Sequence, residues 1–147
     1  MNFAEWVNQR YYHGSYTKLK PGTILRPNPE YEKDWNHTDF YSILEFYRPK
    51  NKLSHKNAVF MCDNLDDIDN AGGATQFIYE IEPLGPVEKH DLNWSSEISM
   101  LAEEPEKNAR KIKTAAMHYW MGEPHPNEQV WEYLTTYARV VALVAEE

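Results

Sequence analysis

In residues 131–144, mostly apolar side chains alternate with more polar ones at the two-residue period of a β-strand. The pattern predicts one long strand that buries one face, on which Glu132 shares the side of the nearly apolar set Leu134, Thr136, Ala138, Val140, Ala142 and Val144. The other face carries Tyr133, Thr135, Tyr137 and Arg139. Because an unpaired buried charge is costly, Glu132 either has a partner in the core or lies at the rim of the sheet and reaches solvent.

Shorter strand and helix patterns follow one another along the rest of the chain. Apolar and aromatic runs predict strands over residues 10–13, 23–25, 58–62 and 75–82. Helical spacing predicts helices over residues 3–9, 40–47, 97–101 and 108–121, and a helical turn over 65–72. Proline and polar residues predict loops over residues 26–35, 50–57 and 83–94. This mixture is typical of an α+β domain.

Chain length and charge limit the domain organisation and the partners. The 147 residues suffice for one hydrophobic core, so we expect a single domain over residues 1–147. Asp and Glu outnumber Lys and Arg by 23 to 15, and the net charge of −8 argues against a broad surface for nucleic-acid phosphates. Lys50, Lys52 and Lys56 form a local basic cluster, which is either a solvated loop or a phosphate contact.

The same sequence argues against disulfides, metals and membranes. Cys62 is the single cysteine, which excludes a disulfide framework and a thiolate zinc cluster and is consistent with a reducing cytosol. His118 and His125 have no third ligand at zinc spacing, so we expect no metal. No leader pattern is present, and no run approaches the roughly 18 apolar residues of a membrane span. We therefore expect a cytoplasmic protein without a membrane partner.

His13 follows two tyrosines and precedes Gly14 at the end of a predicted strand. Glycine has no Cβ, so the backbone at Gly14 can approach whatever His13 contacts. A neutral imidazole offers one donor and one acceptor, which suits a ribose hydroxyl or an amide as well as a structural partner. The chain lacks a G-x-G-x-x-G loop, a phosphate-binding P-loop and a G-x-S-x-G elbow. The absence of these motifs argues against a dinucleotide-binding Rossmann fold, a P-loop nucleotide-binding protein and a serine hydrolase.

Three separated segments together resemble the ADP-ribosyltransferase superfamily, in the H-Y-E branch of diphtheria toxin and the poly(ADP-ribose) polymerases. Residues 11–15, Tyr-Tyr-His-Gly-Ser, resemble the first strand of that family, whose His-Gly opens the NAD pocket. Residues 58–63 resemble the second motif, where a tyrosine stacks on nicotinamide and this chain has Phe60. Residues 131–140 resemble the third, a strand opening on the catalytic glutamate, here Glu132. The resemblance implies an ADP-ribosyltransferase-like split β-sandwich with short flanking helices.

The resemblance also implies roles for individual residues. Glu132, His13 and Phe60 would be catalytic, with His13 on the adenine-side ribose, the Gly14 backbone on the nicotinamide amide and Phe60 as the stacking wall. Phenylalanine keeps the ring face of the family's tyrosine and loses its hydroxyl. Tyr41 or Tyr47 is the candidate for a second stacking aromatic. NAD is thus the expected substrate, bound by His13, Gly14, Ser15, Phe60 and Tyr47.

Residues 13–22 and 81–86 also resemble the small rifamycin-modifying ADP-ribosyltransferases. In those enzymes the third catalytic residue is an aspartate shortly after a Glu-Pro strand end. This chain has His90 and Asp91 in that region, so Asp91 is the alternative to Glu132 as catalytic acid.

By this resemblance we expect a mono-ADP-ribosyltransferase that cleaves the nicotinamide–ribose bond of NAD. The expected acceptor is a macromolecule, protein or nucleic acid, and the expected setting is a toxin or a phage or defence effector, with an antitoxin or another protein as a further partner. The alternatives are transfer to a small rifamycin-like drug, plain hydrolysis of NAD, or a catalytically inactive relative that binds NAD or ADP-ribose. Phe60 keeps the inactive alternative open.

Overall fold

The structure, a computed structural model, describes residues 9–70 and 74–146 and is an α+β protein, as the sequence predicts. Within these residues, seven strands form two antiparallel sheets. The first sheet has the order β1-β4-β7-β2, with β1 (Tyr11–Ser15), β4 (Phe77–Pro83), β7 (Ala138–Glu146) and β2 (Ile24–Leu25). The second has the order β3-β6-β5, with β3 (Val59–Met61), β6 (Trp131–Thr135) and β5 (Glu88–Asp91).

A shared core joins the two sheets. Buried residues from β3, β4, β6 and β7 form one cluster, namely Val59, Met61, Tyr79, Ile81, Tyr133, Ala138 and Val140. The sheets also meet through the backbone, because Tyr12 and Cys62 exchange hydrogen bonds of 2.8 and 3.1 Å in an isolated antiparallel bridge. This bridge brings the start of β1 beside the end of β3.

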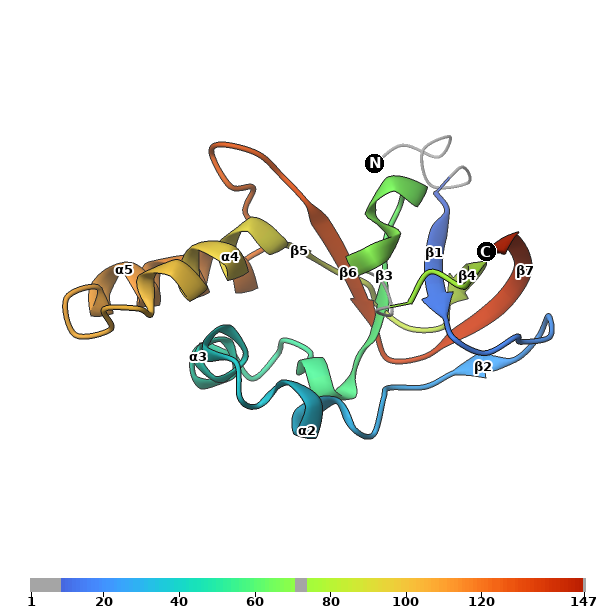
Figure 1. Ribbon diagram of the computed structural model, residues 1–147, viewed down its shortest axis with the longest axis horizontal. Helices are drawn as coiled ribbons and strands as arrows, with labels where there is room; N and C mark the ends of the chain where they lie inside the picture. The colour runs from blue at the N-terminus through green and yellow to red at the C-terminus, as the bar shows by residue number, and fades with distance from the viewer. Residues whose placement is uncertain (1–8, 71–73, 147) are drawn as a thin grey trace.

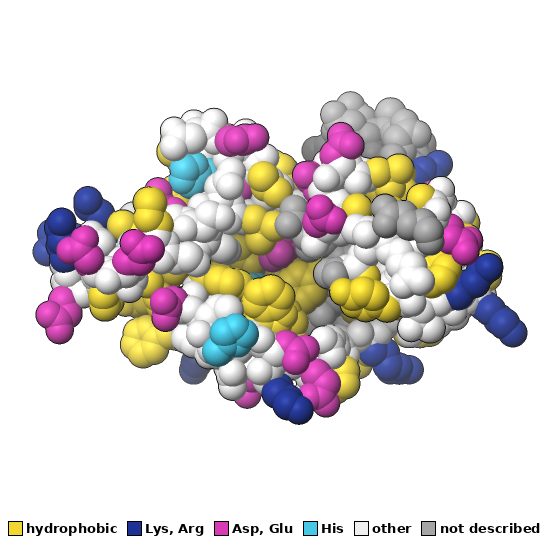
Figure 2. All heavy atoms as spheres, viewed as in Figure 1, with side chains coloured by type: hydrophobic (Ala, Val, Ile, Leu, Met, Phe, Trp, Pro, Cys, Tyr) yellow, Lys and Arg dark blue, Asp and Glu magenta, His cyan; other side chains and the backbone are white. Residues whose placement is uncertain are grey.

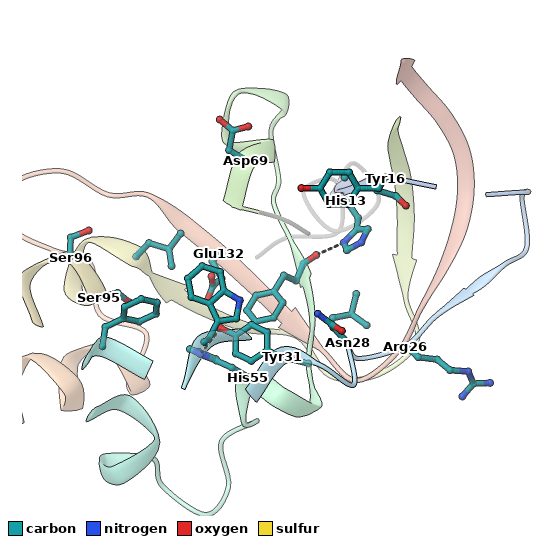
Figure 3. Close-up of a pocket in the computed structure, with 18 of the residues that line it drawn as sticks. His13, Tyr16, Arg26, Asn28, Tyr31, His55, Asp69, Ser95, Ser96 and Glu132 are labelled. Atoms are coloured by element: carbon teal, nitrogen blue, oxygen red, sulfur yellow. Dashed lines mark hydrogen bonds between the residues drawn. The ribbon is translucent and has the colours of Figure 1, made fainter. Parts of the chain in front are cut away.

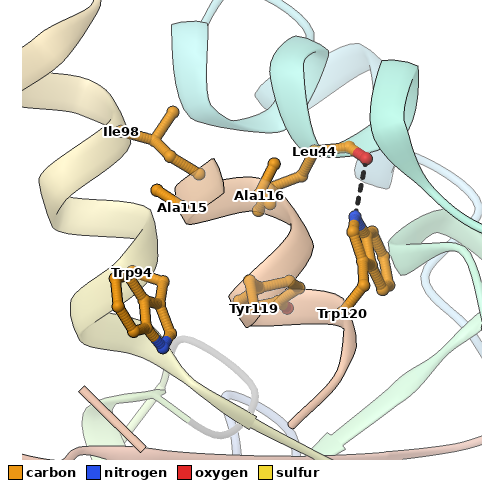
Figure 4. Packing of buried hydrophobic residues seen from close by; sticks show 7 residues of the cluster. All are labelled: Leu44, Trp94, Ile98, Ala115, Ala116, Tyr119 and Trp120. Carbon is orange, nitrogen blue, oxygen red and sulfur yellow. Dashed lines mark hydrogen bonds between the residues drawn. The ribbon is translucent and has the colours of Figure 1, made fainter. Parts of the chain in front are cut away.

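Three helices, α3 (Asp39–Tyr47), α4 (Leu92–Leu101) and α5 (Ala109–Trp120), form a second core at one end of the molecule (Figure 1). The short helix α2 (Tyr31–Trp35) lies against the 3-10 helix η1 (His55–Asn57), and a second 3-10 helix, η2 (Leu65–Asn70), lies against β1 and β3. Helices α3, α4 and α5 bury Leu44, Trp94, Ile98, Ala115, Ala116, Tyr119 and Trp120 against one another (Figure 4). The indole of Trp120 donates to the Leu44 carbonyl at 2.8 Å, which ties α5 to α3.

The prediction of one strand over residues 131–144 is wrong, because the chain forms β6 and β7 in different sheets. In β6 the residues from Glu132 to Thr135 are all buried, whereas β7 begins with the expected alternation of buried and exposed residues. Val144, predicted to lie in the core, is 42% exposed. Thr136 and Tyr137 lie between the strands and continue the same alternation of residue types, so the sequence pattern hides the break.

All three predicted loops contain regular structure, and the stretch 50–57 ends in η1. The proline-punctuated stretch 26–35 includes α2, and the stretch 83–94 includes β5 and the start of α4. Helix α4 begins at Leu92 because the Asp91 carboxylate caps it by accepting from the Asn93 N–H at 3.0 Å. The predicted helix over residues 3–9 lies outside the described residues except for Gln9, and residues 71–73, at the end of the predicted 65–72 turn, lie outside them too. No helix in the described part of the chain is long and apolar enough to cross a membrane.

Candidate functional site

A cavity of about 620 Å³ is lined by residues of both sheets and of the helices (Figure 3). His13, Gly14 and Ser15 reach it from β1, Phe60 from β3 and Glu132 from β6. Segments separated by 47 and 72 residues in the sequence therefore meet in one pocket, as the three motifs predict. Figure 2 shows apolar side chains gathered at the centre of this face and basic side chains at its periphery.

The Phe60 carbonyl of β3 fixes the position of the His13 ring and the nitrogen that carries its proton. The imidazole Nδ1 lies 2.8 Å from the Phe60 carbonyl oxygen, which can only accept, so Nδ1 carries the proton. Burial lowers the pKa of His13, and the ring is therefore neutral at pH 7. Nε2 is then an acceptor, suited to a hydroxyl group of a ligand in the pocket.

Phe60 is stacked against Tyr31 of α2, a residue within the stretch predicted as a loop. The two ring centroids are 5.3 Å apart, with an angle of 19° between the rings. Tyr31 also lines the pocket, and burial together with the nearby Glu132 carboxylate raises the pKa of its phenol. The spacing of Tyr31 and Trp35, four residues apart, is the one sequence signal that could have identified this short helix.

The two candidates for a second stacking aromatic lie elsewhere. Tyr41 is buried beside Tyr31, with ring centroids 5.6 Å apart, but is not among the residues lining the pocket. Tyr47 is partly buried against the core of α3, α4 and α5 and does not line it either. Of the described tyrosines, Tyr31 is the one whose ring is stacked on Phe60.

Glu132 has a partner in the core, which decides between the two alternatives left open by the sequence. It lies on β6, the middle strand of its sheet, and is only 5% exposed. The Tyr119 hydroxyl donates to Oε1 at 2.9 Å. Burial raises the pKa of Glu132 to about 7, although the Tyr119 hydrogen bond acts in the opposite direction. A carboxylate with such a pKa changes its ionisation around neutral pH.

Tyr119 in turn contacts His55 of η1. His55 Nε2 lies 2.6 Å from the Tyr119 hydroxyl oxygen, and Nδ1 lies 3.5 Å from the Tyr31 hydroxyl. Burial lowers the pKa of His55 to about 4, so this imidazole is neutral as well. Sequence reasoning identifies neither His55 nor Tyr119 as a site residue, because His55 lies in a stretch predicted as a polar loop and Tyr119 fits the apolar spacing of its predicted helix.

Asp91, the alternative catalytic acid, has a structural role and does not line the pocket. Its buried carboxylate accepts from the backbone N–H groups of Asn93 at 3.0 Å, His125 at 2.8 Å and Val130 at 3.1 Å. These bonds cap α4 and hold the segment that leads into β6.

We expect Asp91→Ala to lower the free energy of unfolding by about 3 kcal/mol, because buried N–H groups then lose their acceptor. Urea unfolding of the two proteins measures this difference. Asp91→Asn, which keeps one acceptor oxygen, should lose less. An Asp91→Ala protein as stable as the wild type would contradict the structural role.

The pocket extends to both sides of Glu132. Arg26 and Asn28 line it on the side of His13, and Ser95 and Ser96 of α4 line the opposite end (Figure 3). Arg26 is the sole Lys or Arg among the described lining residues. The structure contains no group of three His, Cys, Asp or Glu side chains that could hold a metal ion, within the residues that it describes.

No protein-family model matches this sequence, and its comparison with curated proteins finds no significant match.

Proposed function

We propose that the protein is an NAD-dependent ADP-ribosyltransferase that cleaves the bond between nicotinamide and ribose. The observation that carries the proposal is the convergence of His13, Phe60 and Glu132, which three separate segments bring into one pocket. The presence of two antiparallel sheets that meet beside His13 supports the proposal, because the expected split β-sandwich is built from two such sheets. The NAD substrate, the transfer reaction and the assignment to the superfamily are all part of this proposal.

Glu132 would stabilise the positive charge that develops on the ribose. Cleavage of the nicotinamide–ribose bond passes through an oxocarbenium-like state, as glycoside hydrolysis does. A carboxylate held in a water-poor site stabilises such a cation more than it could in water. The cationic nicotinamide ring of NAD would also favour the ionised form of Glu132, whose pKa of about 7 leaves much of it protonated before the substrate binds.

Phe60 would supply an apolar face for the nicotinamide ring, and a cationic ring is attracted to such a face. Tyr31 covers one face of Phe60 at a centroid distance of 5.3 Å. A ring between the two would need about 7 Å, twice the usual contact distance of carbon atoms. The nicotinamide must therefore use the other face of Phe60 or displace Tyr31.

The acceptor would approach from the part of the pocket beyond Glu132. We propose a macromolecular acceptor, protein or nucleic acid, for a toxin or a phage or defence effector, with an antitoxin as a further partner. The end of the pocket at Ser95 and Ser96 carries uncharged polar side chains, which supports the second candidate, a neutral drug-like acceptor. Proteolysis and nuclease digestion of the labelled product distinguish these acceptors.

The proposal is tested by incubating the protein with NAD labelled in its adenosine part and with cell lysate. Release of nicotinamide together with label on an acceptor supports transfer. Release without a labelled acceptor indicates hydrolysis of NAD. Binding of NAD without release of nicotinamide indicates an inactive relative, whose lack of activity the missing hydroxyl at Phe60 would explain. The Phe60→Tyr variant would then test whether the phenol restores cleavage.

We expect His13→Ala to raise the Kd for NAD about tenfold, because one hydrogen bond to a ribose hydroxyl is lost. Isothermal titration calorimetry with NAD measures this change. His37→Ala, at an exposed position outside the pocket lining, is the matched control and should leave the Kd unchanged. An equal Kd in the His13→Ala protein and the control would remove His13 from the binding site.

A further inference from the structure

The Tyr119 hydroxyl lies between two buried groups. It donates to Oε1 of Glu132 at 2.9 Å, and the Nε2 atom of His55 lies 2.6 Å from the same oxygen. All three side chains are buried, and they come from α5, β6 and η1. Of these residues, His55 and Glu132 line the pocket and Tyr119 does not.

We propose that Tyr119 and His55 are a positioning pair. The Tyr119 hydroxyl, itself held by His55, keeps the Glu132 carboxylate in the orientation that the reaction needs. This inference rests on the proposed function. Neither residue of the pair is assigned contact with the reacting atoms.

The hydrogen-bond donors of His55 and Tyr119 can both point in the direction of Glu132. A tyrosine hydroxyl can donate one hydrogen bond, and that of Tyr119 is donated to Glu132, so the hydroxyl oxygen accepts from the Nε2–H of His55. The neutral imidazole then has Nδ1 as an acceptor, which faces the Tyr31 hydroxyl at 3.5 Å. The Tyr119 hydroxyl donates more strongly to a charged carboxylate than to a neutral carboxyl group, so this hydrogen bond favours the ionised form of Glu132.

The packing of Tyr119 does not depend on its hydroxyl. Its ring is stacked on His90, with centroids 4.5 Å apart and an angle of 18°, and it meets Trp120 edge to face. His90 Nδ1 contacts the Tyr119 backbone carbonyl at 2.7 Å, so the backbone is held separately. Removal of the hydroxyl alone should therefore leave the position of the ring unchanged.

The other titratable groups around the pair have partners of their own. Glu45 of α3 accepts from Ser54 at 2.7 Å and from Arg48 at 3.1 Å. Glu88 of β5 accepts from the Leu53 N–H at 2.9 Å and lies 3.0 Å from His90. The remaining titratable group that contacts His55 from α2 is Tyr31, and Tyr41 of α3 lies beside the same ring. No change at these groups is needed when the Tyr119 hydroxyl is removed.

The test is Tyr119→Phe, followed by two measurements. The first is the titration of the Glu132 carboxyl carbon by NMR in ¹³C-labelled protein, with Glu132→Gln used to assign the signal. Loss of a hydrogen bond to the charged form should raise the pKa of Glu132 by about one unit. The second is the pH profile of kcat/KM for nicotinamide release, whose rising limb should move by the same amount, so that kcat/KM at pH 7 falls about fivefold.

Tyr133→Phe is the matched control, because the Tyr133 hydroxyl also donates a hydrogen bond to a carboxylate, that of Asp63, at 2.9 Å. It should leave both the Glu132 titration and the pH profile unchanged. His55→Gln, which keeps a donor to Tyr119, should shift the titration less than His55→Leu, and this pair decides the case if Tyr119→Phe does not fold.

A Glu132 titration in Tyr119→Phe that matches the wild type would overturn the positioning pair. The NMR titration needs no turnover, so it tests the pair even if the protein releases no nicotinamide, a result that would instead count against the proposed function. A shifted titration with an unshifted activity profile would also overturn the proposal, because Glu132 would then not be positioned for the reaction.

Discussion

Glu132→Gln should reduce the kcat for nicotinamide release by about 10² to 10³, the effect of removing one electrostatic group that acts on a transition state. Glutamine has nearly the same shape and keeps an oxygen that can accept from Tyr119, so the pocket should keep its form. It lacks the negative charge that would stabilise the ribose cation. The Kd for NAD should change less than kcat, because the ribose becomes positively charged only in the transition state.

Steady-state assays of nicotinamide release, with calorimetry for NAD binding, measure the two effects separately. Glu82→Gln is a suitable control, because Glu82 is exposed and pairs with Arg139 at 3.0 Å, away from the pocket. A Glu132→Gln protein that retains wild-type kcat would show that Glu132 is not the catalytic carboxylate. A loss that falls wholly on Kd would assign Glu132 to binding.

The same substitution should stabilise the protein above pH 7. The pKa of Glu132 is raised from 4.5 to about 7 in the folded state, so the folded protein binds a proton that the unfolded chain has already lost. This contribution to stability is fully present below pH 4.5 and is lost as the pH rises through 7. At 1.36 kcal/mol for each pKa unit, the loss is on the order of 3 kcal/mol. The Glu132→Gln variant would avoid this loss, since a glutamine side chain has no acidic proton.

Urea unfolding of the wild type and Glu132→Gln at pH 5 and pH 8.5 tests this prediction. The variant should be the more stable of the two at pH 8.5 by on the order of 3 kcal/mol, and the difference should shrink at pH 5. Glu82→Gln, at an exposed position, is the control for the substitution itself. A difference between wild type and Glu132→Gln that is independent of pH would mean that Glu132 does not titrate near 7.

The site can be predicted from the sequence only where short motifs carry it. His13, Gly14, Ser15, Phe60 and Glu132 belong to such motifs and do line one pocket. Tyr31, His55 and Tyr119 belong to no such motif, because the neighbours that each of them contacts are distant in the sequence. His55 and Tyr119, for example, are 64 residues apart in the chain, and their polar atoms lie 2.6 Å from each other.

Two candidates chosen by local position are corrected by the packing. Tyr47 lies against the helical core, and the Asp91 carboxylate caps α4. Neither side chain lines the pocket, although both lie close in the sequence to residues of the elements around it. Sequence position alone does not report the direction in which a side chain points once its element has packed.

The α+β class, most of the strands and helices, and the residue types available for chemistry follow from the amino-acid sequence, because they depend on periods of 2 and 3.6 residues and on short motifs. The point at which residues 131–144 change sheets and the groups that surround Glu132 follow only from the packed fold. The reason is physical. Periodicity reports which residues avoid water, whereas the ionisation of a carboxylate depends on burial and on hydrogen-bond partners that packing brings from other segments.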